Sequence, residues 1–204
     1  MRYKLSNENQ LFSTRRLEAL SDGVFAIAMT LLVLDLNPRL LGNDLTSSQL
    51  FHALWSSRDS ILSFVISFLM LGSMWAVHMR QFEYIKKANR HLIMINTLRL
   101  LVVVLIPLNT SIAGRYGYLV LGRLMLPLNF FILILISYWQ WSYATHAKVQ
   151  LQGDMSQELK VTADIRNKAL VILSFLIVVA SVWVGDAAFL LIILTPGLMK
   201  YLAR

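Results

Sequence analysis

Residues 16–36 read RLEALSDGVFAIAMTLLVLDL. Beyond its first turns the stretch is almost entirely apolar, over about the twenty residues that an α-helix needs to cross the hydrocarbon core of a bilayer. Asn37 and Pro38 follow directly and end it. The stretch therefore predicts a membrane-spanning helix over residues 17–36, preceded by a polar N-terminal segment, residues 1–16.

The rest of the chain has the same character. Hydrophobic residues make up 57% of its 204 residues and charged residues 15%, against about 25% charged residues in soluble domains. Further apolar segments long enough to be spans lie at residues 60–78, 91–108, 118–143, 168–184 and 187–201, the last being short and carrying Pro196 and Gly197. We therefore expect an all-α, polytopic membrane protein whose residues 1–204 form one domain of six transmembrane helices.

The basic residues predict the orientation of these helices. With the N-terminus inside, the inner segments hold Arg2, Lys4, Arg15, Arg16, Arg80, Lys86, Lys87, Arg90, Lys148, Lys160, Arg166, Lys168, Lys200 and Arg204, and the outer segments hold Arg39, Arg58, Arg115 and Arg123. The positive-inside rule then places both termini in the cytoplasm of a multi-pass protein of the cell membrane. Because these residues lie between apolar segments, the net charge of +8 indicates an anionic membrane face and no nucleic-acid partner.

Several polar side chains fall inside the predicted spans, where ionisable groups are costly and are usually paired or functional, and four of them have matching depths. They are Asp22, His78, Asn96 and Arg99. Counting helix directions from the inside places all four in one layer near the cytoplasmic edge. Two interpretations remain open: a polar clamp that joins three helices through charge-assisted hydrogen bonds, which we favour, or a proton relay or ion site.

The first helix also has a distinct apolar face. At 100° per residue, residues on one side lie within about 60° of Ile27, and Asp22 lies about 140° away, toward the predicted interior of its own subunit. The face consists of Leu20, Gly23, Val24, Ile27, Thr30, Leu31 and Leu34. Such a face can contact lipid, a neighbouring helix or a pore, and the helical wheel leaves these three possibilities open.

Several motifs extend beyond composition. Arg16 is followed, after three residues, by Leu20-Ser21-Asp22-Gly23, and Trp75 and His78 lie together in the second span. Asn96 and Pro107 mark the third span. With these motifs the chain resembles the prokaryotic transmembrane-protein-175 family, relatives of the lysosomal potassium channel of animals. Leu20 stands where that family has phenylalanine.

The resemblance implies a homotetramer of six-helix subunits whose potassium-permeable pore is lined by the first helix. Carried over by distance from Ser21-Asp22-Gly23, the family's apolar constriction corresponds to Ile27, Leu31 and Leu34, and its threonine layer to Thr30. The resemblance assigns a structural network behind the pore to Arg16, Ser21, Asp22, Gly23, Trp75, His78, Asn96 and Arg99. The expected partners are potassium and other monovalent cations, membrane lipid and copies of the same chain, with permeant potassium in place of a cofactor.

The sequence holds no Thr-Val-Gly-Tyr-Gly run, the carbonyl filter of common potassium channels. Selection would then rest on a narrow apolar neck in which cations shed water, and potassium, which holds its water less tightly than sodium, would be modestly preferred. Asp35 ends the first helix and is either a ring of carboxylates at the outer mouth or a solvated helix-terminal charge.

A transporter and an enzyme are the other functions to compare with a channel. A proton-coupled secondary transporter using Asp22 and His78 is the alternative, although no internal repeat typical of transporters is visible. An enzyme is not expected, because the four histidines are dispersed and no metal-binding spacing links them. The chain has no cysteine, which excludes disulfides and Cys-based metal sites.

Overall fold

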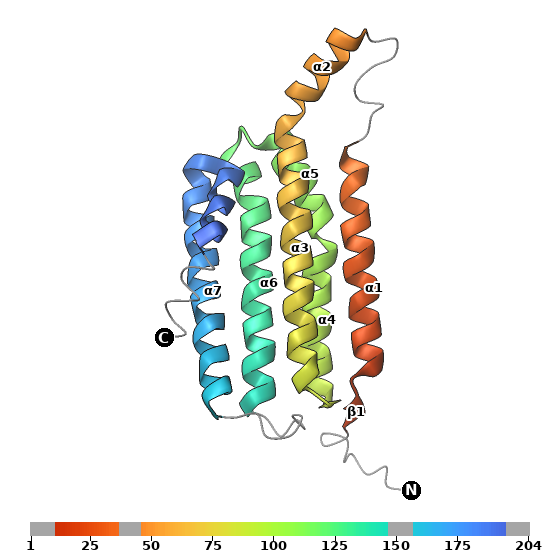
Figure 1. Ribbon diagram of the computed structural model, residues 1–204, viewed down its shortest axis with the longest axis vertical. Helices are drawn as coiled ribbons and strands as arrows, with labels where there is room; N and C mark the ends of the chain where they lie inside the picture. Colours follow the sequence, from red (N-terminus) through yellow and green to blue (C-terminus); the bar gives the residue numbers. More distant parts are fainter. Residues whose placement is uncertain (1–10, 37–45, 147–156, 195–204) are drawn as a thin grey trace, which may run out of the picture.

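The computed structural model describes residues 11–36, 46–146 and 157–194. Figure 1 shows long helices running along one common axis, with the first helix at one side of the bundle and the last long helix at the opposite side. The helices are α1 (Arg15–Leu31), α2 (Ser47–Ser56), α3 (Arg58–Tyr84), α4 (Arg90–Val104), α5 (Ile106–Tyr116), α6 (Val120–His146) and α7 (Gln157–Val184), with 3-10 segments η1 (Leu32–Asp35) and η3 (Gly185–Leu194).

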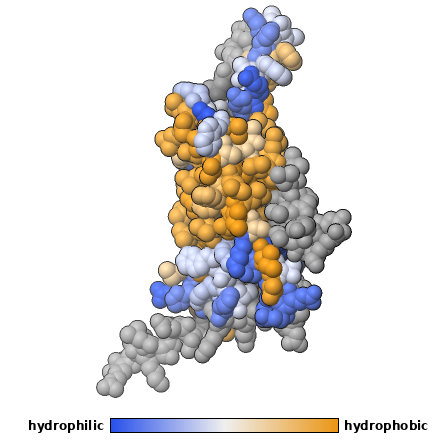
Figure 2. Space-filling view, turned by 90° about the vertical axis from the view of Figure 1, so that its left-hand side faces the viewer, coloured by the Kyte–Doolittle hydropathy of each residue, from blue (hydrophilic) through white to orange (hydrophobic). Residues whose placement is uncertain are grey.

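Five segments of the described residues are long and apolar enough to cross a membrane. They are Arg15–Leu34, Arg58–Tyr84, Arg90–Tyr116, Val120–His146 and Lys160–Ile192. In Figure 2 an apolar band lies between polar ends of the molecule. The expected all-helical, multi-pass class is thus confirmed.

The sixth predicted span, 187–201, differs from the expectation. Its described part lies in η3, which turns away from α7 at Gly185, a glycine with a φ of +58°. That positive φ is readily reached only without a side chain. The same residues count with α7 as one candidate span, and residues 195–201 lie outside the described ranges.

The third predicted span, 91–108, is in fact two helices, because α4 ends at Val104 and α5 runs on to Tyr116. Pro107 lies in the first turn of α5, where its missing N–H has no intrahelical partner to lose. The proline therefore breaks the helix and starts a new one, so the apolar segment continues well past 108.

The other spans are longer than expected at the ends that the sequence predicts to be cytoplasmic. α3 reaches Tyr84, α6 reaches His146, and α7 begins at Gln157, about three turns before residue 168. In α7 the added turns carry charges, and Lys168 pairs with Asp164 at 2.7 Å, one turn apart. Hydropathy marks where a helix meets the bilayer, whereas the hydrogen-bonded backbone continues beyond it.

Helix α2 was not predicted. Thr46 and Gln49 form a capping box, in which the Gln49 side chain accepts from the Thr46 backbone N–H at 2.8 Å and the Thr46 hydroxyl accepts from the Gln49 N–H at 3.4 Å. Figure 1 shows α2 standing above the bundle, beyond the outer end of α3. The Thr-Ser-Ser-Gln pattern is a helix-start signal that was available in the sequence.

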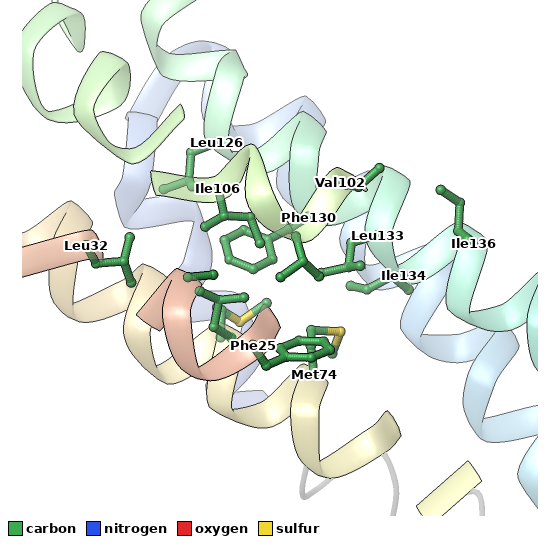
Figure 3. Packing of buried hydrophobic residues seen from close by; sticks show 14 of the residues in the cluster. Phe25, Leu32, Met74, Val102, Ile106, Leu126, Phe130, Leu133, Ile134 and Ile136 are labelled. Atoms are coloured by element: carbon green, nitrogen blue, oxygen red, sulfur yellow. The ribbon is translucent and has the colours of Figure 1, made fainter. Parts of the chain in front are cut away.

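The core of the bundle lies between α1, α3, α4, α5 and α6. Figure 3 shows the buried cluster to which Phe25 of α1 and Leu32 of η1 belong, together with Met74, Ile106 and aromatic and aliphatic side chains of α6. Phe25 and Leu32 are each 0% exposed. These contacts fix the side of α1 that faces its own subunit.

At the inner end, β1 (Phe12–Ser13) pairs antiparallel with β2 (Lys87–Ala88), with Phe12 opposite Ala88. A second, smaller cluster of buried apolar residues lies beside this ladder: Leu17, Phe82, Ile85, Ala88, Leu92 and Ala144. The start of α1 is therefore attached to the turn between α3 and α4.

Candidate functional site: the first helix and its polar network

The inward face of α1 follows a helical repeat. Leu17, Ser21, Phe25, Ala28 and Leu32 are buried, at successive spacings of four, four, three and four residues. Small and large side chains alternate along this face, so the helix packs closely against its neighbours. Both ends of this buried face are fixed. At its N-terminal end β1 pairs with β2, and at its other end Leu32 of η1 continues the packing.

The opposite face of α1 is open in the subunit. Leu20 is 56% exposed, Ile27 60%, Leu31 41% and Leu34 67%. Gly23 and Thr30 are also exposed, whereas Val24 is half-buried at the edge of the core. The apolar stripe predicted from the helical wheel is therefore the side of α1 that its own subunit does not cover.

Thr30 is the polar group of this stripe. Its hydroxyl donates to the Ile27 carbonyl at 2.8 Å, as helical threonines commonly do. Because Thr30 is exposed and its hydroxyl hydrogen is used in this bond, the oxygen can still accept a hydrogen bond or contact a cation. Asp35 ends η1, and its side chain lies outside what the structure describes.

Arg99 is the centre of one polar cluster. It is 0% exposed, and its Nη1 donates to His78 Nδ1 at 3.0 Å and to Gln81 Oε1 at 3.1 Å, while Nη2 donates to the Met74 carbonyl at 3.2 Å. A guanidinium has no acceptor, so His78 Nδ1 is the acceptor and its ring is neutral in this arrangement. The cluster joins α4 to α3.

The ring of Phe25 adds a contact from α1. The Arg99 guanidinium carbon lies 6.0 Å from the ring centroid of Phe25, within the range of a cation–π interaction. Within the described ranges no carboxylate forms an ion pair with Arg99. Its charge is therefore stabilised by neutral acceptors and an aromatic ring.

A second cluster joins α1, α4 and α6. Asn96 Nδ2 donates to Ser21 Oγ at 3.1 Å, and Ser21 Oγ donates to the Leu17 carbonyl at 2.8 Å. Gln140 Nε2 reaches Asn96 Oδ1 at 3.4 Å. Ser21, Asn96 and Gln140 are each 0% exposed, so three helices are linked by side chains that water cannot reach in the folded subunit.

Asp22 differs from the expectation. Its side chain is exposed at the rim of the contact between α1 and α3, where Trp75 Nε1 donates to Asp22 Oδ1 at 2.9 Å. The expected common cluster of Asp22, His78, Asn96 and Arg99 is instead three separate groups. A helical wheel gives only the direction in which the Asp22 side chain leaves α1. The position of α3 beside α1 decides whether a side chain in that direction is buried or exposed.

Arg16 and Gly23 lie outside these clusters. Arg16 is exposed and forms no side-chain hydrogen bond among the described residues, and a Cβ on Gly23 would meet nothing within 4 Å. The transporter alternative needs Asp22 and His78 to act together, yet each is bonded to a different partner. Their participation in one proton path is not supported by this geometry.

Sequence reasoning missed Gln81 and Gln140, which are 5% and 0% exposed. The sequence prediction rests on ionisable groups inside the spans, whereas the side chains of Gln81 and Gln140 are neutral amides. Gln81 lies one turn after His78, a spacing that places both on one helix face, so the signal was present. In another part of the bundle, Ser63 Oγ of α3 donates to the Asp186 carboxylate of η3. The described residues contain no group of three or more side chains suited to a metal ion.

Comparison with known proteins gives the family context of this arrangement. Residues 16–107 match the sequence model of the family described as endosomal/lysosomal potassium channel TMEM175. The matched range begins at Arg16 and ends at Pro107, so it covers the motifs that carry the resemblance. The resemblance predicted from the sequence is thus confirmed over α1, α3 and α4.

Known relatives are channels. A potassium channel of Streptomyces collinus is 42% identical over 102 residues, which are 50% of this chain and 48% of the relative. A potassium channel of Chamaesiphon minutus is 36% identical over 104 residues, 50% of each chain. The endosomal/lysosomal proton channel TMEM175 of Gallus gallus is 36% identical over 111 residues, 52% of this chain and 22% of the relative.

The matched region covers about half the length of the bacterial relatives and about a fifth of the animal one. A solved structure covers more. The crystal structure of a lysosomal potassium-selective channel TMEM175 homolog from Chamaesiphon minutus aligns over 93% of this chain and 96% of that chain, with a TM-score of 0.72 and 24% sequence identity. The fold is therefore that of this channel family, and the relatives agree with the prediction that the chain is not an enzyme.

Proposed function

We propose that this chain is one subunit of a homotetrameric, potassium-permeable cation channel in the cell membrane, with both termini in the cytoplasm. Four copies of α1 line its pore. Ile27, Leu31 and Leu34 form an apolar constriction, and Thr30 contributes a ring of hydroxyls. Permeant potassium, with other monovalent cations, takes the place that a substrate or cofactor has in other proteins.

The exposed stripe of α1 is the observation that carries the proposal. One face of the helix is packed into the subunit and the other is open along its whole length, from Leu20 to Leu34. Figure 1 shows α1 at the side of the bundle away from α7, so this open face is available to neighbouring copies. The relatives named as potassium channels supply the reason to choose a pore over lipid for its surroundings.

The proposed mechanism is partial dehydration. A ring of bulky apolar side chains makes a narrow neck that water leaves readily, and such a neck can gate by drying. A cation that crosses it loses part of its hydration shell, and Thr30 oxygens replace some of the lost water. Potassium gives up water more easily than sodium, so a modest potassium preference follows without a carbonyl filter.

The polar clusters support the pore from behind. Arg99 with His78 joins α4 to α3, Asn96 with Ser21 joins α4 to α1, and Trp75 with Asp22 joins α3 to α1. In this proposal they hold the packed face of α1 in register, so that the open face is presented to the axis. They are positioning groups and do not contact the permeant ion.

The test is the reversal potential of purified full-length protein in planar bilayers under potassium–sodium gradients. We expect currents with a potassium preference, and we expect Ile27→Ala or Leu31→Ala to raise the conductance because the neck widens. Leu121→Ala is the matched control, since Leu121 is 70% exposed on α6, away from α1. Unchanged currents in both neck variants would overturn the pore assignment.

A proton gradient at symmetrical potassium separates the other possibilities. A reversal potential that follows the proton gradient would mean a proton channel, the activity named for the animal relatives. Saturating, proton-driven flux without single-channel openings would indicate the transporter alternative. Either result replaces the potassium proposal.

A further inference from the structure

A large cavity lies at the inner end of the bundle, between α3, α6 and α7. Its volume is about 560 Å³, within the range of about 300–1,000 Å³ that is usual for ligand cavities. Charged, polar and aromatic side chains line much of its wall: Arg80, Gln81, Glu83, Tyr84, Trp141, Arg166 and Asn167. We call this the inner cavity. In Figure 1, α6 and α7 lie on the side of the bundle away from α1, so the cavity is separate from the proposed pore.

The charges in the inner cavity are unbalanced. Two guanidinium groups, Arg80 and Arg166, stand against one carboxylate, Glu83. Within the described part of the chain none of the three forms an ion pair. Arginine binds phosphate oxygens through two parallel N–H groups, and the unpaired excess of one positive charge matches a ligand with one negative charge.

Two aromatic rings place this charge at the membrane surface. Tyr84 and Trp141 stand edge to face with centroids 6.2 Å apart, near the inner ends of α3 and α6. Tyr and Trp rings settle at the level of lipid headgroups. In Figure 2 the apolar band gives way to polar surface at the same inner end of the molecule.

The inner cavity continues toward the bilayer centre. A small cavity shares Val77, Asn167 and Leu170 with it, and is otherwise lined by Met74, Ile134, Ser137 and Tyr138. Above that lies an apolar cavity of about 180 Å³, which again shares Val77 and Leu170 and extends to Pro127 and Phe189. This path is thus a row of three adjoining cavities, from a basic, aromatic end to an apolar end, with a narrow middle cavity of about 10 Å³.

We propose that this path binds an anionic glycerophospholipid, with its phosphodiester at Arg80 and Arg166 and an acyl chain along the apolar cavities toward Phe189. The two arginines, the aromatic pair and the apolar cavities follow one another along the path. A lipid has its phosphate, glycerol and hydrocarbon in the same order. Basic pockets between transmembrane helices on the cytoplasmic side are a known form of anionic-lipid site. The site does not depend on the proposed pore.

Native mass spectrometry of the full chain, titrated with phosphatidylglycerol or phosphatidylcholine of identical acyl chains, tests the charge recognition. We expect phosphatidylglycerol to bind more tightly, and Arg80→Ala/Arg166→Ala to weaken its binding about tenfold while phosphatidylcholine binding is unchanged. Lys87→Ala/Arg90→Ala is the control, because it removes the same charge from the inner surface outside the cavity. An equal loss in both double variants would overturn the site.

A second readout tests the location. The chain has no cysteine, so Asn167→Cys introduces a single thiol in the cavity wall. We expect phosphatidylglycerol vesicles to slow its alkylation relative to phosphatidylcholine vesicles, and glycerol phosphate at the same concentration to have no effect. Protection by glycerol phosphate would reduce the site to an anion site.

Two further outcomes would contradict the proposal. Glu83→Gln removes the one acidic group and should keep or increase phosphatidylglycerol binding, so weaker binding would mean that an amine is recognised instead. The thiol introduced by Asn167→Cys could also be protected without added lipid. If deletion of residues 195–204 then removed that protection, the path would be occupied by the chain's own C-terminal segment.

Discussion

Arg99 tests whether the buried polar cluster acts as a clamp. Its guanidinium is fully buried and donates to His78, Gln81 and the Met74 carbonyl. Arg99→Met keeps most of the volume but removes every donor. The same change in a background with His78→Phe and Gln81→Met removes the side-chain acceptors as well. The comparison of the two variants measures the cost of unpaired acceptors, less the bond from Gln81 Nε2 to the Ser137 carbonyl at 3.2 Å, which Gln81→Met also removes.

The magnitude follows from the bonds in the structure. In Arg99→Met, two side-chain acceptors stay buried without a donor, at a cost of about 1–3 kcal/mol each for an unpaired buried group. Hydrogen bonds inside membrane proteins average about 0.6 kcal/mol, because the unfolded chain in the membrane also finds partners. We therefore expect the triple variant to be more stable than the single variant by about 2–4 kcal/mol, even though it carries two more substitutions. Replacing a complete buried polar set by apolar groups is often neutral or stabilising.

The assay is reversible unfolding of the purified protein in mixed micelles with increasing sodium dodecyl sulfate, followed by far-UV circular dichroism at fixed protein concentration. Thr97→Ala is the control: Thr97 is exposed on α4 and bonds only the Ile93 carbonyl of its own helix, so a change within about 0.5 kcal/mol is expected. A triple variant that is the least stable of the set would refute the reasoning, since the three losses would then be independent.

Three further predictions concern α1. Thr30→Ala should lower the potassium-over-sodium permeability ratio and Thr30→Ser should retain it, because only the first removes the hydroxyl; unchanged reversal potentials in both would remove Thr30 from selection. Asp35→Asn should reduce single-channel conductance at low salt and have little effect at about 1 M salt, where charges are screened within about 3 Å; an equal reduction at both salt concentrations would speak against a cation-concentrating ring. Phe25→Ala, at a site 0% exposed, should destabilise the subunit by about 3–5 kcal/mol in the micelle assay, whereas Leu20→Ala on the open face should change it by less than 1 kcal/mol.

The two faces of α1 were predictable because they depend on the helix alone. Ile27 and Leu34 lie on the face chosen by the helical wheel, and both are more than half exposed, whereas Phe25 and Leu32 on the other side are fully buried. The period of 3.6 residues relates every side chain of one helix to every other. Such a relation needs no knowledge of neighbouring helices.

The partners of the polar residues were less predictable, because they depend on how helices are placed beside one another. Counting turns placed Asp22 and Arg99 at one depth, but depth does not give lateral position. α3 brings Trp75 to Asp22, and α4 turns Arg99 toward His78. Asp22 and Arg99 are therefore satisfied separately, and an ion pair between them is not needed to explain either.

The buried and exposed faces of α1 allow effects of substitutions on folding stability to be distinguished from effects on ion permeation. Changes on the packed face, such as those at Phe25 or Ser21, act on folding and reach permeation only through it. Changes on the open face, such as those at Ile27 or Leu31, remove fewer contacts within the subunit than changes at fully buried positions, so a large effect on permeation with little effect on stability must arise outside it. If α1 faced lipid, the open-face changes would be silent in both assays, because one aliphatic side chain is as well solvated by acyl chains as another. A large effect on conductance without an effect on stability is thus the signature of a pore that several subunits build together.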